Sequence, residues 1–336
     1  MNRTRLPHAD TAKGLMIIMI VFGHFIERLL DWNATPKMPL LSLMYLIHIP
    51  TFVFLSGCFF TPRHWQHKIK RLALLYVLFQ LLYTVCNRVT PPPHLISQSF
   101  LYDLIIFIAR PNWIMWYLYS LMLWYALTPL LQKCRFSLAL SCAAALAAGW
   151  ATWDTYWFSL GRTLCFLPFF LLGQQHGTAL LHRLRHTCPA WQHLACIALI
   201  TALLAYCCVA GALNISFVYG SFNFWQQHLD PIHGTLLRVF VMLLSALGVL
   251  AALQSAVLLS GRRGASILAA LGRRTLPVYL LHGFAVLAVQ PFYPWRHDFA
   301  ATCLFATLAS VLTAWACSRN GVQKVFDGII FGKQTN

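Results

Sequence analysis

The stretch that decides the fold is Asp10-Thr-Ala-Lys13-Gly14-Leu-Met-Ile-Ile-Met-Ile-Val-Phe-Gly23-His24, in which a cation opens an apolar helix that carries an imidazole near its middle. A continuous apolar run of this kind is typical of a membrane-spanning helix rather than of an alternating strand. On a helix, Lys13 and His24 lie about 20° apart around the axis and about 16 Å apart along it. Because an ionisable side chain inside a membrane is costly, His24 is a candidate functional residue.

The composition of the whole chain indicates the same class of protein. Of the 336 residues, 59% are hydrophobic and only 10% are charged, whereas soluble domains carry about 25% charged residues. Only helix bundles and closed barrels satisfy the backbone polar groups in lipid. Since the apolar runs do not alternate, we predict an all-α fold. It is a polytopic transmembrane helix bundle, expected as one membrane-embedded domain over residues 1–336 without a separate soluble domain.

The apolar runs predict about ten membrane spans, and a short apolar segment over 99–109 is expected in the outer interface. The spans are expected at 14–31, 40–60, 72–88, 113–131, 136–153, 160–178, 191–211, 235–259, 275–291 and 299–317. Lys and Arg gather in every second connection, as they do in cytoplasmic loops. This bias predicts that the N-terminus and the C-terminus are both cytoplasmic.

Two other classes of site are disfavoured by the sequence. The net charge of +17 does not indicate nucleic-acid binding, because the basic residues fall in short loops and no soluble basic face exists to carry it. The eleven cysteines are scattered through apolar stretches and are expected as small apolar fillers. The histidines lack the spacing of zinc ligands, so we expect no metal.

Three histidines fall at mid-membrane depth in the predicted spans. His24 is about 15 Å from the inner end of its span, His48 about 12 Å from the outer end and His282 about 12 Å from the inner end. A neutral imidazole at such a depth can accept a proton from a hydroxyl group. The alternative for His24 is a buried histidine that hydrogen-bonds a neighbouring helix.

Two cations at the start of the third span share a helix face. Lys68 and Arg71 stand at positions i and i+3, so their side chains are neighbours. Such a pair suits the phosphates of a cytoplasmic nucleotide-like cofactor and equally suits anionic lipid head groups. Lys13 could likewise be an ordinary topology anchor.

The second span and the outer ends of other spans hold further candidates, each with a structural alternative. In the second span, Pro50 frees backbone carbonyls and Ser56 precedes a glycine that allows close packing, which also fits a kinked packing helix. The candidates at the outer ends of other spans are two aromatic residues and two arginines. Trp116 and Tyr117 suit an aromatic belt or a sugar ring, and Arg162 and Arg238 suit a polar or anionic ligand or snorkelling to head groups.

Seven motifs follow one another along the chain from residue 10 to about 285. They are Asp10-x-x-Lys13-Gly14, Lys13 to His24, His48-Ile-Pro50 through Ser56-Gly57, Lys68 with Arg71, Trp116-Tyr117-Leu118, Arg162 with Leu167-Pro168-Phe169-Phe170 and Gly173, and Gly272-Arg273-Arg274-Thr275-Leu276 with Tyr279 and His282-Gly283. In this order the motifs resemble the acyltransferase family 3 membrane proteins, and they are most similar to the fucose 4-O-acetylase-like group of sugar acetyltransferases. Lys13 replaces the commoner arginine, and Thr51 interrupts the usual Pro–aromatic run.

The resemblance implies a membrane O-acetyltransferase of the bacterial cytoplasmic membrane. Acetyl-CoA would bind from the cytoplasm with its phosphates at Lys13, Lys68 and Arg71. Its thioester would lie near His24, which would act as the base or as a transient acetyl carrier. The remaining site residues, as acceptor-binding or orienting groups, would be Asp10, His48, Ser56, Trp116, Tyr117, Arg162, Arg238, Tyr279 and His282.

The acceptor and the partners are less defined by the sequence. A cell-surface glycan or a lipid-linked sugar is expected as the acceptor, membrane lipids surround the chain, and the oligomeric state stays open, with a homodimer as one option. The alternative function is a multi-span transporter or flippase in which the midplane histidines relay protons. Broken helices near Pro50 and Pro277 would suit that alternative, but no convincing internal repeat supports it.

Overall fold

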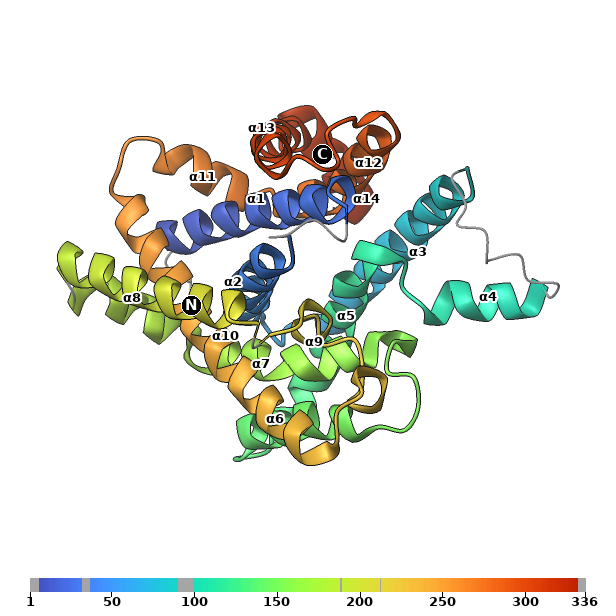
Figure 1. Cartoon of the computed structure of the whole chain (residues 1–336), viewed down its shortest axis with the longest axis horizontal. Helices are drawn as coiled ribbons and strands as arrows, with labels where there is room; N and C mark the ends of the chain where they lie inside the picture. Colours follow the sequence, from blue (N-terminus) through green and yellow to red (C-terminus); the bar gives the residue numbers. More distant parts are fainter. Residues whose placement is uncertain (1–5, 32–36, 90–99, 188, 212, 332–336) are drawn as a thin grey trace. The chain divides into compact units, whose positions relative to one another are not determined.

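The computed structural model describes residues 6–31, 37–89, 100–187, 189–211 and 213–331, and these ranges fold into helices without a strand (Figure 1). The fold class is therefore all-α, as predicted. The principal helices are α1 Pro7–Leu29, α2 Lys37–Cys58, α3 Trp65–Val89, α4 Phe100–Ala109, α5 Trp116–Leu131, α6 Ser137–Trp150, α7 Leu160–Thr187, α8 Ala190–Val209, α10 Pro231–Ser260, α11 Ala265–Gly272, α12 Thr275–Val289, α13 Phe299–Cys317 and α14 Asn320–Phe331. Short turns of helix join them, namely α9 Ile215–Val218 and the 3₁₀ segments η1 Trp113–Met115, η2 Trp157–Ser159, η3 Trp225–Gln227 and η4 Gln290–Phe292.

Within the described ranges, nine helices are long and apolar enough to cross a membrane. The span expected at 136–153 corresponds to α6, whose 14 residues reach only about 21 Å against a hydrocarbon core of about 30 Å. The expected short segment at 99–109 corresponds to α4. The polytopic helix bundle is confirmed, whereas residues 1–5 and 332–336 lie outside the described residues and the location of the termini stays a prediction.

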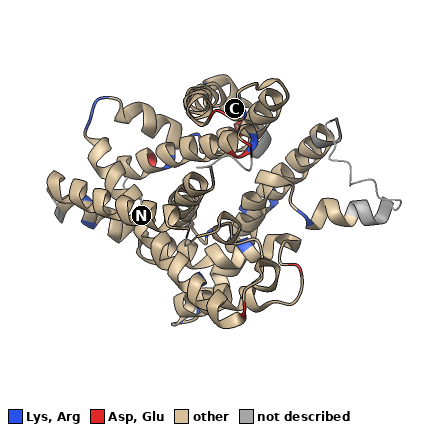
Figure 2. Cartoon of the chain, viewed as in Figure 1, with Lys and Arg blue, Asp and Glu red and all other residues tan. Residues whose placement is uncertain are grey.

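Charged residues are sparse along these helices, as Figure 2 shows. Apolar side chains instead cover much of the exposed surface, with Leu199, Leu304 and Leu308 among the large hydrophobic residues that are more than half exposed. In a soluble protein such a surface would aggregate, but in a bilayer it contacts lipid. The exposed apolar helices therefore agree with the membrane location that the sequence predicts.

The contacts group the chain into two compact units. The first unit comprises residues 1–58, 173–218 and 240–336, and the second comprises 59–172 and 219–239. The helices α7 and α10 each contribute residues to both units. The expectation of one membrane-embedded domain stays a prediction.

In the first unit, α1 is the central helix and packs against α2, α11, α12 and α13 (Figure 1). Two glycines permit the close approach of α11. A Cβ at Gly14 would overlap the carbonyl oxygen of Leu268, and a Cβ at Gly272 would overlap that of Asp10. Small residues allow helix backbones to approach in this way in membranes. The two motifs Asp10-x-x-Lys13-Gly14 and Gly272-Arg273-Arg274 consequently meet at the same end of α1.

In the second unit, α5 packs against α3 and is bonded to α7 through buried polar groups. The Ser120 and Thr163 hydroxyls lie 2.7 Å apart, and the indole Nε1–H of Trp124 donates to the Thr163 carbonyl at 2.8 Å. Interhelical hydrogen bonds of this kind help to fix helix packing where lipid supplies no polar partner. They place the start of α7, with Arg162, beside the start of α5, with Trp116.

Candidate active site

The three histidines expected at mid-membrane depth come together in the first unit. The rings of His24 on α1 and His282 on α12 are stacked, with centroids 5.2 Å apart and an angle of 29° between the planes. His48 on α2 interacts electrostatically with His24, and a Cβ at the neighbouring Gly23 would lie 3.9 Å from His48 Cε1. Three helices therefore supply one imidazole each to a single buried cluster.

Backbone carbonyls fix two of these rings. The Nδ1–H of His48 donates to the Met44 carbonyl at 2.6 Å, and the Nδ1–H of His282 donates to the Val278 carbonyl at 3.1 Å. A ring that donates through Nδ1 presents Nε2 as an acceptor. The buried Nε2 of His282 has no hydrogen-bond partner among the described residues, so it can accept a hydrogen bond from a ligand or a water.

Glu27 completes the cluster, and the sequence reasoning missed it. Its Oε2 lies 2.9 Å from Nδ1 of His24, and the two side chains are only 16% and 9% exposed. The signal was present in the sequence, because residues at i and i+3 share a helix face and a carboxylate inside a span is itself costly. When Nδ1–H donates to Glu27, Nε2 of His24 is the ring nitrogen that carries the basic lone pair.

Lys13 lies on the same helix as His24 but deeper in it than expected. The helix begins at Pro7 rather than at residue 14, because proline is favoured in the first turn, so Lys13 stands in the second turn. It interacts electrostatically with Asp10 and with Cys58, and Asp10 Oδ2 also lies 4.0 Å from Arg273 Nη1. The Lys13–His24 spacing of about 16 Å along α1 is unchanged.

The cations Lys68 and Arg71 line a pocket of about 510 Å³ in the second unit. Lys68 Nζ donates to the Thr61 hydroxyl at 2.6 Å and to its carbonyl at 3.2 Å, which holds the ammonium at the pocket wall. The remaining lining residues are Thr61, Arg63, His64 and His67. Since Lys13 belongs to the first unit, a joint contact of Lys13, Lys68 and Arg71 with one ligand stays a prediction.

Arg162 is surrounded by aromatic rings in the second unit. Its guanidinium carbon lies 4.8 Å from the ring centroid of Trp116, 5.6 Å from that of Tyr219 and 5.9 Å from that of Tyr156. Arg162 is half-buried and makes no hydrogen bond to the residues that the structure describes. Its N–H groups can therefore bind a ligand, while the rings offer apolar faces on which a sugar can stack.

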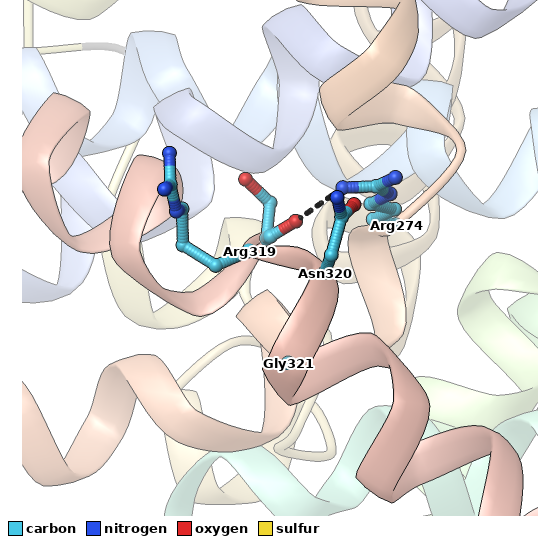
Figure 3. A pocket seen from close by; sticks show the side chains of 5 residues that line it. Arg274, Arg319, Asn320 and Gly321 are labelled. Atoms are coloured by element: carbon cyan, nitrogen blue, oxygen red, sulfur yellow. Dashed lines mark hydrogen bonds between the residues drawn. The ribbon is translucent and has the colours of Figure 1, made fainter.

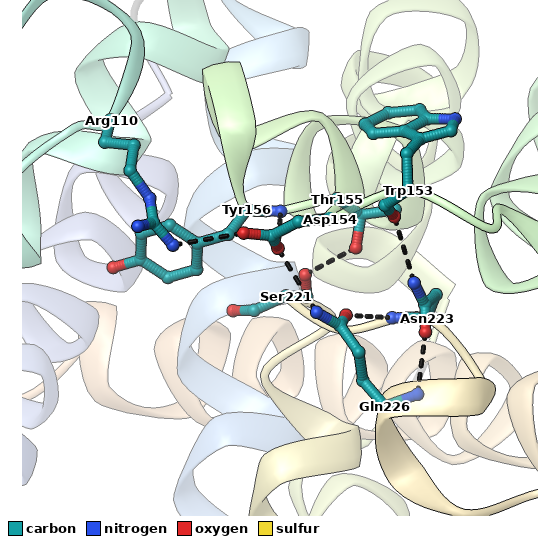
Figure 4. Close-up of polar contacts among 8 residues, drawn as sticks. All are labelled: Arg110, Trp153, Asp154, Thr155, Tyr156, Ser221, Asn223 and Gln226. Atoms are coloured by element: carbon teal, nitrogen blue, oxygen red, sulfur yellow. Dashed lines mark hydrogen bonds and ion pairs between the residues drawn. The ribbon is translucent and has the colours of Figure 1, made fainter. Parts of the chain in front are cut away.

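A polar network surrounds one of these rings, that of Tyr156 (Figure 4). Arg110 Nη2 lies 3.1 Å from Asp154 Oδ2, and the Arg110 guanidinium lies 5.2 Å from the Tyr156 centroid. Gln226 Nε2 donates to Asp154 Oδ1 at 3.3 Å, and the Thr155 hydroxyl donates to the Ser221 carbonyl at 2.8 Å. The network ties residues 154–156 to residues 221–226, and sequence reasoning did not identify it because its members are far apart in the chain.

Arg238 differs from Arg162 in its surroundings. It is only 3% exposed, contacts Cys165 Sγ at 2.5 Å and donates to the carbonyls of Phe222 at 3.3 Å and Ala145 at 3.4 Å. Arg238 therefore uses its N–H donors in bonds within the protein. Of the two arginines predicted to face an acceptor, Arg162 is the more accessible to a ligand.

Three further predicted site residues, Ser56, Tyr117 and Tyr279, lie on α2, α5 and α12. The Ser56 hydroxyl donates to the Phe52 carbonyl at 2.9 Å. The Tyr279 ring lies 6.1 Å from that of His282, and Tyr117 packs edge-on against Trp124. Tyr279 thus borders the histidine cluster, whereas Ser56 bonds within its own helix.

Among the described residues, no group of three or more His, Cys, Asp or Glu side chains is placed to hold a metal ion.

The comparisons with known proteins give one match. A family model described as an acyltransferase domain, that of acyltransferase family 3, matches residues 7–319. The matched range includes the histidine cluster, Glu27, the Lys68–Arg71 pocket and the aromatic rings around Arg162. The comparison with curated proteins and the comparison with solved structures give no match.

Proposed function

The chain belongs to acyltransferase family 3, and we propose that this membrane acyltransferase moves an acetyl group from cytoplasmic acetyl-CoA to a hydroxyl of an extracytoplasmic sugar. Its location would be the cytoplasmic membrane of a bacterium. The observation that carries the proposal is the pair formed by His24 and Glu27 inside the histidine cluster. A buried imidazole oriented by a carboxylate is suited to general-base catalysis of acyl transfer.

The proposed step balances protons and bonds at His24. Nε2 of His24 takes the proton of the acceptor hydroxyl while the hydroxyl oxygen attacks the thioester carbonyl. The C–S bond then breaks, the new ester is released, and the proton passes from His24 to the departing coenzyme A thiolate. Glu27 stabilises the protonated imidazole in between. A transient acetyl group on Nε2 is the second form that this reaction can take.

The donor side of the proposal rests on the pocket of Lys68 and Arg71. Its volume of about 510 Å³ is in the range of small-molecule sites, and its cations suit phosphate oxygens. The expected acceptor side rests on Arg162 and its aromatic rings, because aromatic faces and unoccupied N–H donors are suited to a sugar with polar or anionic substituents. The choice of a sugar acceptor follows the resemblance to the fucose 4-O-acetylase-like group.

Mass spectrometry of cell-envelope glycans tests the function. Strains with and without the gene should differ by an acetyl ester on one glycan, and wild-type protein should restore it in the deletion strain. Supply of labelled acetyl-CoA to inverted membrane vesicles should place the label in the same ester. Identical glycans in both strains, together with transport of a glycan precursor by the purified protein in liposomes without an acetyl donor, would favour the transporter instead.

A further inference from the structure

A second pocket, of about 340 Å³, lies in the first unit where α13 ends and α14 begins, beside the start of α12 (Figure 3). It is lined by Arg274, Ser318, Arg319, Asn320 and Gly321. The proposed acetyl transfer uses none of these residues. No carboxylate lines the pocket, so both arginines present positive charge to any ligand in it.

The two arginines are held in different ways. Arg274 Nη1 donates to the Ser318 carbonyl at 2.8 Å, as the dashed line in Figure 3 shows, and this bond fixes its guanidinium at the pocket wall. The guanidinium of Arg319 lies over the Trp315 ring, 4.8 Å from its centroid. The guanidinium of Arg319 donates no hydrogen bond to the described part of the chain, so its N–H groups are available to a ligand.

Backbone N–H groups add further hydrogen-bond donors to those of the two arginines. In the described residues, the first amide of α14 that is bonded is that of Gln323, which donates to the Arg319 carbonyl at 3.0 Å. The N–H groups of Asn320 and Gly321 precede it without an acceptor, as is usual in a first helical turn. The Ser318 hydroxyl donates to the Trp315 carbonyl at 3.0 Å, so its proton is already used. The pocket therefore offers several donors and demands a ligand rich in acceptors.

The position of the pocket along the spans narrows the class of ligand. Arg274 directly precedes the span Thr275–Phe292, and Ser318 and Arg319 directly follow the span Phe299–Cys317. Both spans therefore place their ends, and the pocket, at the boundary between hydrocarbon and water. Phosphate groups of lipids lie at that depth, and water-soluble phosphates reach it from the aqueous side.

We propose that this pocket binds a phosphate group through Arg274 and Arg319, with the first amides of α14 as additional donors. Guanidinium groups pair with phosphate through charge-assisted hydrogen bonds, and arginine suits phosphate better than lysine because its donors form a planar fork. The phosphate belongs either to an anionic membrane lipid or to a soluble phosphate compound. The proposal does not depend on the acetyl-transfer reaction.

The test measures binding by purified full-length protein in two arms. In the first, native mass spectrometry follows phosphatidylglycerol retained by the protein after extraction. In the second, calorimetry follows inorganic phosphate added to the protein in phosphatidylcholine nanodiscs. The variants are Arg319→Gln and the pair Arg274→Gln with Arg319→Gln. The matched control removes two exposed arginines from the α10–α11 connection, Arg262→Gln with Arg263→Gln.

The expected result is that Arg319→Gln weakens binding about tenfold in one of the two arms, that the pair weakens it further, and that the control binds like wild type. If the variants retain less phosphatidylglycerol than wild type, the ligand is a lipid phosphate. If they bind inorganic phosphate more weakly than wild type, the ligand is a soluble phosphate. Removal of Arg274 could lower the unfolding temperature of the double variant. In that case the test rests on Arg319→Gln alone, because Arg319 contacts only an exposed ring and its replacement leaves the fold intact. Binding by Arg319→Gln and by the control that equals wild type in both arms would overturn the proposal.

Discussion

His24 and Glu27 stand one turn apart on α1, with Nδ1 of the imidazole 2.9 Å from Oε2 of the carboxylate. The ring of His24 is stacked on that of His282 from α12. The carboxylate therefore orients one member of a cluster that three helices assemble. If this pair performs the proposed proton transfer, removal of the charge on Glu27 should act on the chemical step rather than on binding.

The change Glu27→Gln keeps the size of the side chain but removes its negative charge. We expect kcat for acetyl transfer to fall about tenfold or more, because the amide no longer stabilises a protonated His24, while KM for acetyl-CoA stays as in wild type. Steady-state kinetics on the purified variant measure both constants. A raised KM with an unchanged kcat would place Glu27 in donor binding instead.

The pocket of Lys68 and Arg71 gives a prediction for the donor. Replacement of both residues by glutamine should raise the Kd for acetyl-CoA about tenfold or more, because charge-assisted hydrogen bonds to phosphate are lost. The matched control is Lys133→Gln with Arg135→Gln, two exposed cations of the same unit. Calorimetric titration of each double variant with acetyl-CoA measures the Kd. If the Lys68 and Arg71 variant binds acetyl-CoA as tightly as the control, the two residues are lipid anchors instead.

The aromatic surroundings of Arg162 give a prediction for the acceptor. Arg162→Gln should raise KM for the acceptor about tenfold and leave KM for acetyl-CoA unchanged, because the lost donors face the acceptor alone. Arg135→Gln is the control, since Arg135 also lies over an aromatic ring, that of Phe136, at 5.7 Å. Kinetics with the unacetylated form of the glycan that the mass spectrometry identifies separate the two constants. A loss confined to the acetyl-CoA constant would contradict the assignment.

The contact between α1 and α11 gives a prediction for stability. Gly14→Ala should destabilise the protein by about 1–3 kcal/mol, because the added methyl group overlaps the Leu268 carbonyl oxygen. The control Gly261→Ala adds the same methyl group where no atom lies within 4 Å. The unfolding temperatures of the two variants are compared in detergent. Equal unfolding temperatures would show that α11 shifts away from α1 at little cost in free energy.

The helical class, most span positions and the histidines on α1, α2 and α12 could be predicted from the sequence, because hydropathy and the 1.5 Å rise per residue act locally. The stacking of His24 on His282 could not, since it depends on how α12 packs against α1. Glu27 was within reach of the i, i+3 rule and was overlooked. The beginning of α1 at Pro7 was missed because polar residues at 8–13 interrupt the hydropathy signal.

The two outer arginines illustrate the same limit. Arg162 and Arg238 have equivalent places at the starts of predicted spans, yet one is half-buried among aromatic rings and the other is enclosed by backbone carbonyls and Cys165. Residues 219–226 contribute to both environments, through Tyr219 beside Arg162 and the Phe222 carbonyl beside Arg238. Hydrogen bonds of Asp154, Gln226 and Asn223 hold this segment. A pattern of charge along the chain contains no information about such contacts.

The central claim is that His24 transfers the proton of the acceptor hydroxyl, and the most direct measurement is kcat for acetyl transfer by His24→Ala beside His297→Ala. His297 provides the matched control because its side chain is 90% exposed. The account predicts that His24→Ala lowers kcat by about 10²–10⁴-fold at an unchanged unfolding temperature, while His297→Ala keeps wild-type activity. A folded His24→Ala protein with wild-type kcat would contradict it.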